Sequence, residues 1–504
     1  MNANHQLRSA VFTLLGLPLV AIAADQCTAP STKQLALDIN TAVVTRAGIP
    51  KELFGFNVPW SDFQSSYVNQ EGVVREDLYP LLAPFAGAVY RYPGGNPTNN
   101  FEWKKTVGAT AARTTMVSDF NNKTVPSFGL DEFGGFVKRL NSRAILTLNI
   151  YGKVATPSTA DAASADAVGM LNYVRTTSPF KCVTGASCGV MAVELGNELD
   201  LAPINWSAST YVTRAGAVIS AVNKTANLSG IEWVVSGRTA PWSGTDYNDF
   251  NDTLATGLSK VARGIAIHPY YDGIDIPYAM KFVNAFGKTW TTARSDGKVY
   301  VTEHARWPTV PKVGEWRDNW YMATSLGGAI SSVDFLLALM GNNQVASSNW
   351  HALGNAGPWN LIRVSKLDNK LYPSPVYWGL RTAREAYLDN LVQVKYTVPK
   401  STSGYSGGYD VKLVGMSATG GNSASVIGVN RGTEPYLVTI NWSAGKRNAG
   451  TATLRTTTAA SAATDNTDNA PNAVTMASSQ KQLASRTSSS WCVPAQSVFS
   501  IVEP

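Results

Sequence analysis

The sequence has few residues that bind metals: four histidines and four cysteines in 504 residues, and no CxxC pair. Beyond the N-terminal segment the histidines (His268, His304 and His351) are far in sequence from the cysteines. Structural zinc sites combine closely spaced cysteines with histidines, so we expect no metal and no other cofactor. Lysine and arginine form no long run although the formal net charge is +7. This scatter argues against a nucleic-acid partner.

Long apolar runs are also missing, except near the N-terminus. There Arg8 and an apolar stretch over 11–22 precede small residues at Ala23 and Ala24. This is the pattern of a secretory signal peptide, and the stretch is too short to span about 30 Å of hydrocarbon. We therefore predict a signal peptide over 1–24 and a secreted or periplasmic protein that has no membrane partner after cleavage. The sequence does not indicate an oligomeric state.

An even number of cysteines in an exported chain predicts disulfide bonds. Cys182 and Cys188 are close in sequence, so the simplest pairing closes that local loop. It leaves Cys27 to pair with Cys492. This second bond would tie the mature N-terminus to the C-terminal segment.

The largest part of the chain alternates short apolar runs with helical stretches, the pattern of repeated β/α units. The continuous apolar character of the runs fits parallel strands covered on both faces. Eight such units predict an α/β fold, a (β/α)8 TIM barrel over 51–380, with functional groups at the C-terminal ends of its strands. The predicted strands are Leu53–Val58, Ala88–Tyr92, Ile145–Ile150, Val190–Leu195, Glu232–Ser236, Gly264–Ile267, Val299–Thr302 and Val345–Ser348.

The remainder of the chain, 381–504, has short alternating runs separated by Gly, Ser, Thr and Asn, which predict a C-terminal β-sandwich. An extended stretch at Gln34–Val44, within an N-terminal segment over 25–50, is expected to join it. Residues 451–490 are rich in Ala, Thr, Ser and Asn and are predicted as long surface loops or a weak strand pair. The predicted strands are Val392–Val398, Tyr409–Val414, Ala424–Val429, Tyr436–Asn441 and Val498–Val502.

Two of the predicted barrel strands, the fourth and the seventh, end in glutamates. Glu198 follows Gly196 and Asn197 after one strand, and Glu303 ends the other. Hydrolysis of a glycosidic bond with retention needs two carboxyl groups about 5–5.5 Å apart. Glu198 is the candidate acid/base and Glu303 the candidate nucleophile. Solvated loop carboxylates are the usual fate of glutamate, but two on suitable strands favour the catalytic interpretation.

Polar side chains end the other predicted strands as well. Tyr270 can donate a hydrogen bond to Glu303, and His268 can bind a sugar hydroxyl. Asn57 and Arg91 are equally compatible with structural hydrogen bonds and ion pairs beneath the site, and Glu194 is expected to lie inside its strand. The remaining residues at strand ends are Asn149, Asn349 and His351, and the tryptophans that could line sugar subsites are Trp60, Trp103, Trp242, Trp307, Trp350 and Trp359.

Several motifs occur along the predicted barrel. They are Arg91-Tyr92-Pro93-Gly94-Gly95-Asn96 with Trp103 and Val107-Gly108, Phe128–Phe133, Asn149, Gly196-Asn197-Glu198-Leu199-Asp200 and His268-Pro269-Tyr270. Together they resemble the motifs of the family 51 α-L-arabinofuranosidases of glycoside hydrolase clan A. The resemblance implies a TIM barrel followed by a β-sandwich, retaining glycosidase chemistry on a carbohydrate substrate, and the roles given above to Glu198 and Glu303. It also implies substrate contacts from Asn96, Asn197, His268 and Tyr270.

The sequence departs from the family around the sugar. Where the family has an Asp-Glu-Trp-Asn type of run, this chain has Glu303 followed by His-Ala-Arg306-Trp307, and the Gln of the eighth strand has no clear equivalent in 348–352. Arg306 can pair with a substrate carboxylate or form an internal salt bridge. A β-glucuronidase-like enzyme, as in the more distantly similar family 79 glucuronidase and heparanase group, is therefore the alternative. A non-catalytic carbohydrate-binding protein is a further alternative, disfavoured because both glutamates are present.

Overall fold

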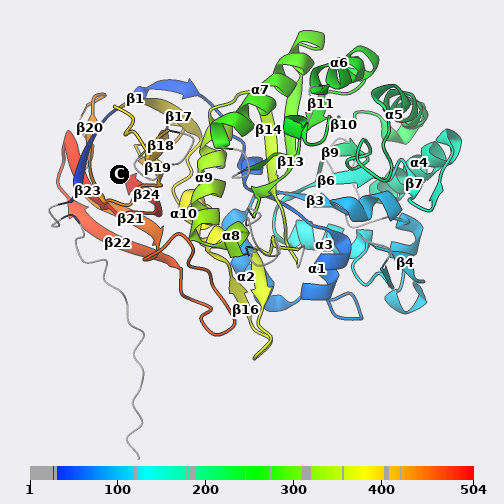
Figure 1. Ribbon diagram of the computed structural model, residues 1–504, viewed down its shortest axis with the longest axis horizontal. Coiled ribbons are helices and arrows are strands. Elements are labelled where there is room, and N and C mark those ends of the chain that lie inside the picture. The colour runs from blue at the N-terminus through cyan, green and yellow to red at the C-terminus, as the bar shows by residue number, and fades with distance from the viewer. Residues whose placement is uncertain are drawn as a thin grey trace, which may run out of the picture.

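A closed ring of parallel strands forms the larger part of the computed structural model (Figure 1). In chain order its eight strands are β2 (Gly55–Asn57), β3 (Val89–Tyr92), β6 (Arg143–Leu148), β9 (Val190–Leu195), β10 (Trp233–Ser236), β11 (Gly264–Ala266), β13 (Lys298–Arg306) and β14 (Val345–Trp350). Pairing of β11 with β13 closes the ring. Each predicted barrel strand overlaps one of these, so the TIM barrel is confirmed. The structure describes residues 27, 31–118, 122–177, 180, 189–243, 246–271, 275–308, 319, 321–354, 357–401, 408–420, 422–445 and 447–504.

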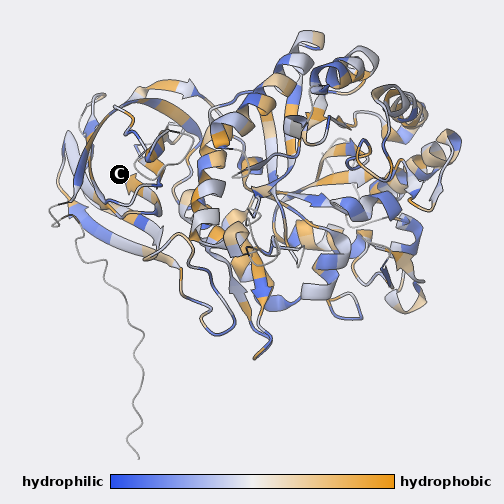
Figure 2. Ribbon diagram, viewed as in Figure 1, coloured by the Kyte–Doolittle hydropathy of each residue, from blue (hydrophilic) through white to orange (hydrophobic). Residues whose placement is uncertain are grey.

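Helices cover the outside of the barrel, and Figure 2 colours them in alternating hydrophilic and hydrophobic segments, as expected for helices with one buried face. Three of them start at a residue whose side chain accepts a backbone N–H of the first turn (Thr159, Ser207 and Asp275), which stabilises a helix N-terminus. The helices are α1 (Trp60–Tyr67), α2 (Tyr79–Leu82), α3 (Leu130–Arg139), α4 (Ala160–Thr176), α5 (Ala208–Asn223), α6 (Tyr247–Leu258), α7 (Ile276–Ala293), α8 (Tyr321–Thr324), α9 (Leu326–Met340) and α10 (Pro375–Arg384). Among the described residues no helix combines the length and the apolar character that a membrane span requires.

Short helices and strands lie in the loops at the C-terminal ends of the barrel strands. The 3₁₀ helices η5 (Asn96–Asn100) and η6 (Trp103–Thr106) follow β3, and β12 (Tyr270–Tyr271) follows β11 and pairs with the end of β13. Three two-stranded sheets are β4 (Met116–Val117) with β5 (Lys123–Thr124), β7 (Gly152–Lys153) with β8 (Thr156–Pro157), and β15 (Ile362–Val364) with β16 (Leu371–Pro373).

A second sheet of nine strands curls around its own apolar core beside the barrel (Figure 1). Its strands are β1 (Lys33–Arg46), β17 (Asn390–Lys395), β18 (Val411–Ser417), β19 (Ala424–Asn430), β20 (Tyr436–Trp442), β21 (Gly450–Thr458), β22 (Met476–Leu483), β23 (Ser488–Val493) and β24 (Ser497–Glu503). Strand β1 lies between β17, to which it is antiparallel, and β20, to which it is parallel. The curled sheet matches the predicted sandwich-like C-terminal part.

The segment 451–490 is more ordered than loops. It contributes β21 and β22, which pair along eight residues each, and part of β23. Of the two expectations for this segment, the strand pair is therefore confirmed. These strands are rich in Thr and Ser because β22 is largely exposed, whereas β21 buries only some of its side chains.

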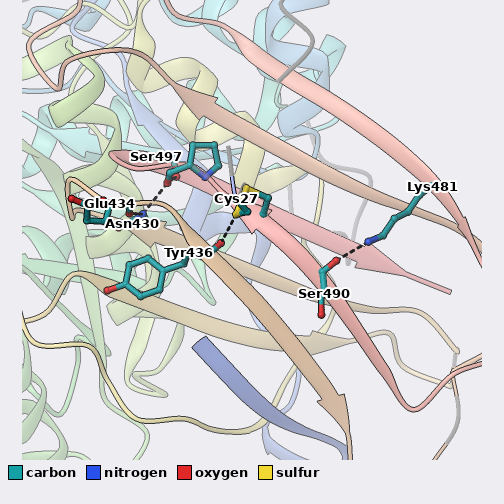
Figure 3. Close-up of a disulfide and its surroundings, with 9 residues drawn as sticks. Cys27, Asn430, Glu434, Tyr436, Lys481, Ser490 and Ser497 are labelled. Atoms are coloured by element: carbon teal, nitrogen blue, oxygen red, sulfur yellow. Dashed lines mark hydrogen bonds between the residues drawn. A yellow bond between two sulfur atoms is a disulfide. The ribbon is translucent and has the colours of Figure 1, made fainter. Parts of the chain in front are cut away.

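The predicted Cys27–Cys492 disulfide is present, with 5.6 Å between the two Cα atoms (Figure 3). It joins the start of the described chain to β23, and the Cys27 sulfur also lies 3.5 Å from the Tyr436 carbonyl on β20. The other predicted bond, between Cys182 and Cys188, lies outside the described residues.

Removing this disulfide should destabilise the curled sheet. A bond between residues 465 positions apart restricts the unfolded chain strongly, so Cys492→Ser is expected to lower the free energy of unfolding by about 2–5 kcal/mol. The measurement is chemical denaturation under oxidising conditions, with Ser490→Ala, an exposed position on the same strand, as control. Equal midpoints for Cys492→Ser and wild type would contradict the expectation.

The barrel and the curled sheet meet at α9 and α10, which pack against β19, β21 and β24. A buried carboxylate lies at this interface. Asp334 of α9 is fully buried and contacts Lys412 at 3.0 Å and Arg431 at 2.7 Å. The hydroxyl of Tyr409 donates to it as well, at 2.7 Å. The barrel and the sheet are thus joined by charge as well as by apolar contact.

Candidate active site

The two glutamates that end predicted strands lie together at the C-terminal mouth of the barrel. Glu303 belongs to β13, and Glu198 follows a tight turn after β9. Gly196 makes this turn with φ of 76°, where a Cβ would lie 2.6 Å from Leu199. Glu198 itself has a φ of 48°, in the left-handed region that few non-glycine residues adopt. Carboxylate oxygens of Glu198 and Glu303 and a ring nitrogen of His268 all lie within 4.8 Å of one another.

Arg91 of β3 connects the residues beneath this mouth, and its side chain is fully buried. Its Nε donates to Glu194 at 2.5 Å, and its Nη2 donates to the Asn197 side chain at 2.8 Å. Its Nη1 donates to Glu303 at 3.2 Å. Glu194 is ionised, since Arg91 and His268 lower its pKa to about 2 although burial opposes this. Arg91 thus orients one carboxylate of the mouth through direct contact.

His268 bridges the two strands that carry the glutamates. Its Nδ1 lies 2.7 Å from Glu198 and its Nε2 lies 2.9 Å from the hydroxyl of Thr302, which in turn donates to Glu194. Burial would lower its pKa, but the nearby carboxylates Glu303, Glu194 and Glu198 raise it to about 10. The ring is therefore an imidazolium at neutral pH, with both nitrogens donating.

The same three side chains are close enough to hold a metal ion, with His268 supplying a nitrogen and the glutamates supplying oxygens. A metal ligand must offer a lone pair, and histidine does so only when neutral. His268 is protonated, and Arg91 adds a second positive charge beside Glu303. The chemistry of this cluster fits hydrogen bonding better than metal coordination.

Four groups surround the carboxylate of Glu303. The Tyr270 hydroxyl donates to Oε1 at 2.9 Å, and Nδ1 of His351 lies 3.1 Å from the same oxygen. Arg91 and His268 face Oε2 at 3.2 and 3.6 Å. Burial alone would raise the pKa of Glu303, but the positive charges of His351, when protonated, and of His268 and Arg91, with the Tyr270 hydrogen bond, lower it. Glu303 is therefore held in its ionised form.

The carboxyl groups of the cluster differ in their contacts and in their exposure. Arg91 contacts both Glu194 and Glu303, whereas the described contact of Glu198 is with His268. The Glu198 side chain is 17% exposed, against 7% for Glu303 and 0% for Glu194. Glu198 is therefore the carboxyl group of the three that is most open to solvent and to a bound molecule.

Aromatic rings form one wall of the mouth. Trp359 lies 5.0 Å from Tyr270 and 5.3 Å from Trp307, measured between ring centroids. Trp307 is 38% exposed, so part of its ring is open to a ligand. Flat aromatic faces next to two carboxyl groups suit a sugar ring, whose C–H faces are apolar.

The structure brings most of the predicted site residues to this mouth, including Asn197, which donates to exposed Asn96 at 3.3 Å. Three others have their described contacts elsewhere. Trp103 packs on Tyr173 and donates to Asp166. The amide of Asn149 is occupied by backbone groups of its own turn and of Phe101. The side chain of Arg306 fills the space where Gly327 of α9 lacks a Cβ.

Two residues of the cluster received no role from sequence, Glu194 and His351. Glu194 lies inside its strand as expected, yet its side chain points into the barrel and pairs with Arg91. Strand alternation carries this signal, because Glu194 is on the same face as the barrel-lining Ala192. His351 directly follows β14, but only the structure places it against Glu303.

A parallel barrel with two carboxyl groups a few ångströms apart at its C-terminal mouth is the arrangement used by retaining glycosidases. Residues 81–252 match the family described as "Alpha-L-arabinofuranosidase 1 domain". This match confirms the resemblance seen in the motifs and indicates a glycosidase. No curated protein sequence matches the chain.

Solved structures of arabinofuranosidases share the fold. The enzyme of Thermotoga maritima, in complex with arabinose, has a TM-score of 0.75 at 17% identity, over 94% of this chain and 100% of that one. The enzyme of Xanthomonas axonopodis pv. citri has a TM-score of 0.74 at 17% identity, with the same shares covered. A family 44 xyloglucanase from Paenibacillus polymyxa is less similar, with a TM-score of 0.59 at 12% identity over 94% and 99% of the two chains.

Proposed function

We propose that the protein is an exported retaining glycosidase that releases α-L-arabinofuranosyl groups from a polysaccharide or an oligosaccharide. The observation that carries the proposal is the pair Glu198 and Glu303, with oxygens within 4.8 Å and with Glu198 the more exposed of the two. The family match and the fold of the arabinofuranosidases support the choice of sugar. The predicted signal peptide and the Cys27–Cys492 disulfide support export, since disulfides persist in oxidising compartments.

The proposed reaction has two steps. Glu303 attacks the anomeric carbon while Glu198 gives its proton to the departing glycosidic oxygen, which yields a glycosyl ester on Glu303. Glu198, now ionised, takes a proton from water, and the water oxygen attacks the anomeric carbon and releases Glu303. Two inversions at one carbon give net retention. His268 donates to Glu198 throughout, so the acid/base keeps its orientation in both protonation states.

A glucuronidase gains no support from the described position of Arg306, whose guanidinium lies beside Gly327 of α9. The pairing of β13 is irregular between Val301 and His304; beyond that point His304 and Arg306 share one face of the strand, whereas Glu303 points into the mouth. His304 packs on Tyr271 and Phe335, outside the barrel.

The test is a panel of 4-nitrophenyl glycosides, the α-L-arabinofuranoside with the β-glucuronide, β-xyloside and β-glucoside. We expect the arabinofuranoside to have the highest kcat/KM, and NMR during its hydrolysis to show the α anomer first. Preference for the glucuronide would refute the sugar assignment. Initial release of the inverted anomer would refute retention, and no turnover of any substrate would favour a binding protein.

A further inference from the structure

A cavity of about 600 Å³ lies at the N-terminal end of the barrel, which is the end opposite the mouth. Its wall consists of the first residues of several barrel strands and of the segment that leads from β1 to the 3₁₀ helix η2 (Lys51–Phe54). Its floor is the inner layer of the barrel, with Met191, Tyr300 and Ala346. Sites for small molecules have volumes of about 300–1,000 Å³, so the cavity is large enough for a ligand.

The charged side chains that line this cavity are mostly positive. Four cations and two carboxylates give the lining a net charge of +2. The cations are Arg46 at the end of β1, Arg143 at the start of β6, Arg263 just before β11 and Lys298 at the start of β13, and the carboxylates are Glu52 of η2 and Glu232 just before β10. The cavity therefore has the charge that an anionic ligand requires.

Each of the two carboxylates already has its own cation. Glu52 lies 3.1 Å from Arg143, and Glu232 lies 3.2 Å from Arg263. The Tyr300 hydroxyl also donates to Glu232, at 2.5 Å. The two arginine side chains are 38% and 39% exposed, and the Nη2 group of each has no acceptor among the described residues. Both guanidinium groups can therefore donate to a ligand while they keep their ion pairs.

These two guanidinium groups lie near the same part of the cavity. Burial and the charge of Glu232 raise the pKa of the Tyr300 hydroxyl, whereas the charges of Arg263 and Arg143 both act in the opposite direction. Tyr300 is on the floor, so both positive charges are close to it. One ligand above Tyr300 can thus receive hydrogen bonds from both arginines.

The other two cations, Arg46 and Lys298, have no ion-pair partner among the described residues. Arg46 donates to main-chain carbonyls, that of Asn342 at 2.7 Å, and Lys298 donates to the Asn343 carbonyl at 3.1 Å. Burial lowers the pKa of Lys298, and the charges of Arg263 and Arg46 lower it further, by more than nearby carboxylates raise it. An ammonium group has three donors, so Lys298 keeps two for a ligand. Partly buried positive charge without a counter-charge is unfavourable, and a bound anion would supply that counter-charge.

We propose that this cavity binds a small anion with at least two negative charges on phosphate or carboxylate groups. The planar guanidinium groups of Arg143 and Arg263 suit the oxygens of either group, and Lys298 adds a compact positive charge. The ligand joins the starts of β6, β11 and β13, so it stabilises the folded barrel. It lies at the opposite end of the barrel from Glu198 and Glu303, and the inference does not depend on the proposed glycosidase function.

The first test is isothermal titration calorimetry of the protein with pyrophosphate and with citrate, which separates a preference for phosphate from one for carboxylate. We expect saturable binding of at least one of them. Lys298→Gln should raise its dissociation constant by about 10- to 100-fold, because it removes a charged donor. Lys288→Gln, at an exposed position on α7 outside the cavity, is the control and should bind as the wild type does. The glycosidase assay is not needed, so failure of the proposed function remains distinguishable.

Arg263→Gln is the second variant, in case Lys298→Gln does not fold, and it should weaken binding by a similar factor. A further measurement needs no variant, because an anion that binds only the folded protein raises its Tm. The rise should exceed that caused by sodium chloride at equal ionic strength. Three results would each overturn the inference: neither anion binds, chloride raises the Tm as much, or Lys298→Gln and Arg263→Gln both bind as tightly as the wild type.

Discussion

Glu303→Ala is expected to lower kcat/KM for an aryl arabinofuranoside by on the order of 10⁴-fold or more, since no glycosyl ester can form without its carboxylate. Arg91, Tyr270 and His268 would remain in place around the vacated position.

Glu198→Ala should behave differently. It removes only proton transfer, which contributes about 10²- to 10⁴-fold. The loss should be large for a poor leaving group such as phenol and small for 2,4-dinitrophenol, which departs without protonation.

Azide distinguishes the two roles by the product that forms. In Glu198→Ala, azide can replace water in the second step, so the glycosyl azide should have the configuration of the substrate. In Glu303→Ala, azide can occupy the position of the lost carboxylate and attack directly, so the product should be inverted. Glu71→Gln, at an exposed position, serves as control and should have wild-type kinetics. If Glu198→Ala gave the inverted glycosyl azide and Glu303→Ala gave the retained one, the roles of the two glutamates would be reversed.

Asp334→Ala is expected to cost about 3–5 kcal/mol in free energy of unfolding, because it leaves positive charge uncompensated at a buried interface. Arg431 and Lys412 of the curled sheet would lose the carboxylate that they share on α9. Chemical denaturation measures the loss. Tyr409→Phe, which removes only a hydroxyl donor from the same carboxylate, should cost about 1 kcal/mol. Asp252→Ala, at an exposed site on α6, should cost little.

The contribution of Asp334 also depends on pH. Lys412, Arg431 and Tyr409 lower its pKa below the usual 3.8 although burial opposes this. A carboxylate with a lowered pKa in the folded state adds stability that is fully present above its unfolded pKa and is lost as pH falls towards the folded one. The difference in stability between wild type and Asp334→Ala should therefore be constant near neutral pH and shrink below about pH 4. A difference that grows on acidification would contradict the charge assignment.

Local sequence patterns were sufficient to predict the barrel. Its buried strands are continuous apolar runs, so all eight could be located, and polar residues at the ends of most runs marked the mouth. Glu198, Glu303, Tyr270 and His268 were predicted in this way and lie together. Contacts between side chains of different strands could not be found from periodicity, as His351 illustrates. Its contact with Glu303 depends on the neighbouring positions of β13 and β14 in the closed ring.

The direction of a side chain at a strand end was harder to predict. Arg306 is three residues from Glu303, which places it on the opposite face of β13, although nearness in sequence suggested a shared site. Trp103 and Asn149 follow strand ends too, but the Trp103 ring nitrogen donates to Asp166 of α4, and the Asn149 amide binds the backbone of its own turn. In the curled sheet, β21 and β22 contain many Thr and Ser residues, which are tolerated because part of each strand faces solvent. The alternation between polar and apolar residues along these strands is therefore weak.

The position of β1 has a consequence for the synthesis of the protein. This strand leaves the ribosome near the start of translation, but its two neighbours in the sheet come from the last quarter of the chain, at Lys395 and at Tyr436. Until those residues are made, both edges of β1 have unpaired backbone groups, which invite pairing with other chains. A nascent or truncated chain therefore has, near its N-terminus, an extended strand whose two edges are unpaired. Such a strand is prone to pair with other chains. Proteins that shield extended segments would protect the molecule at this stage.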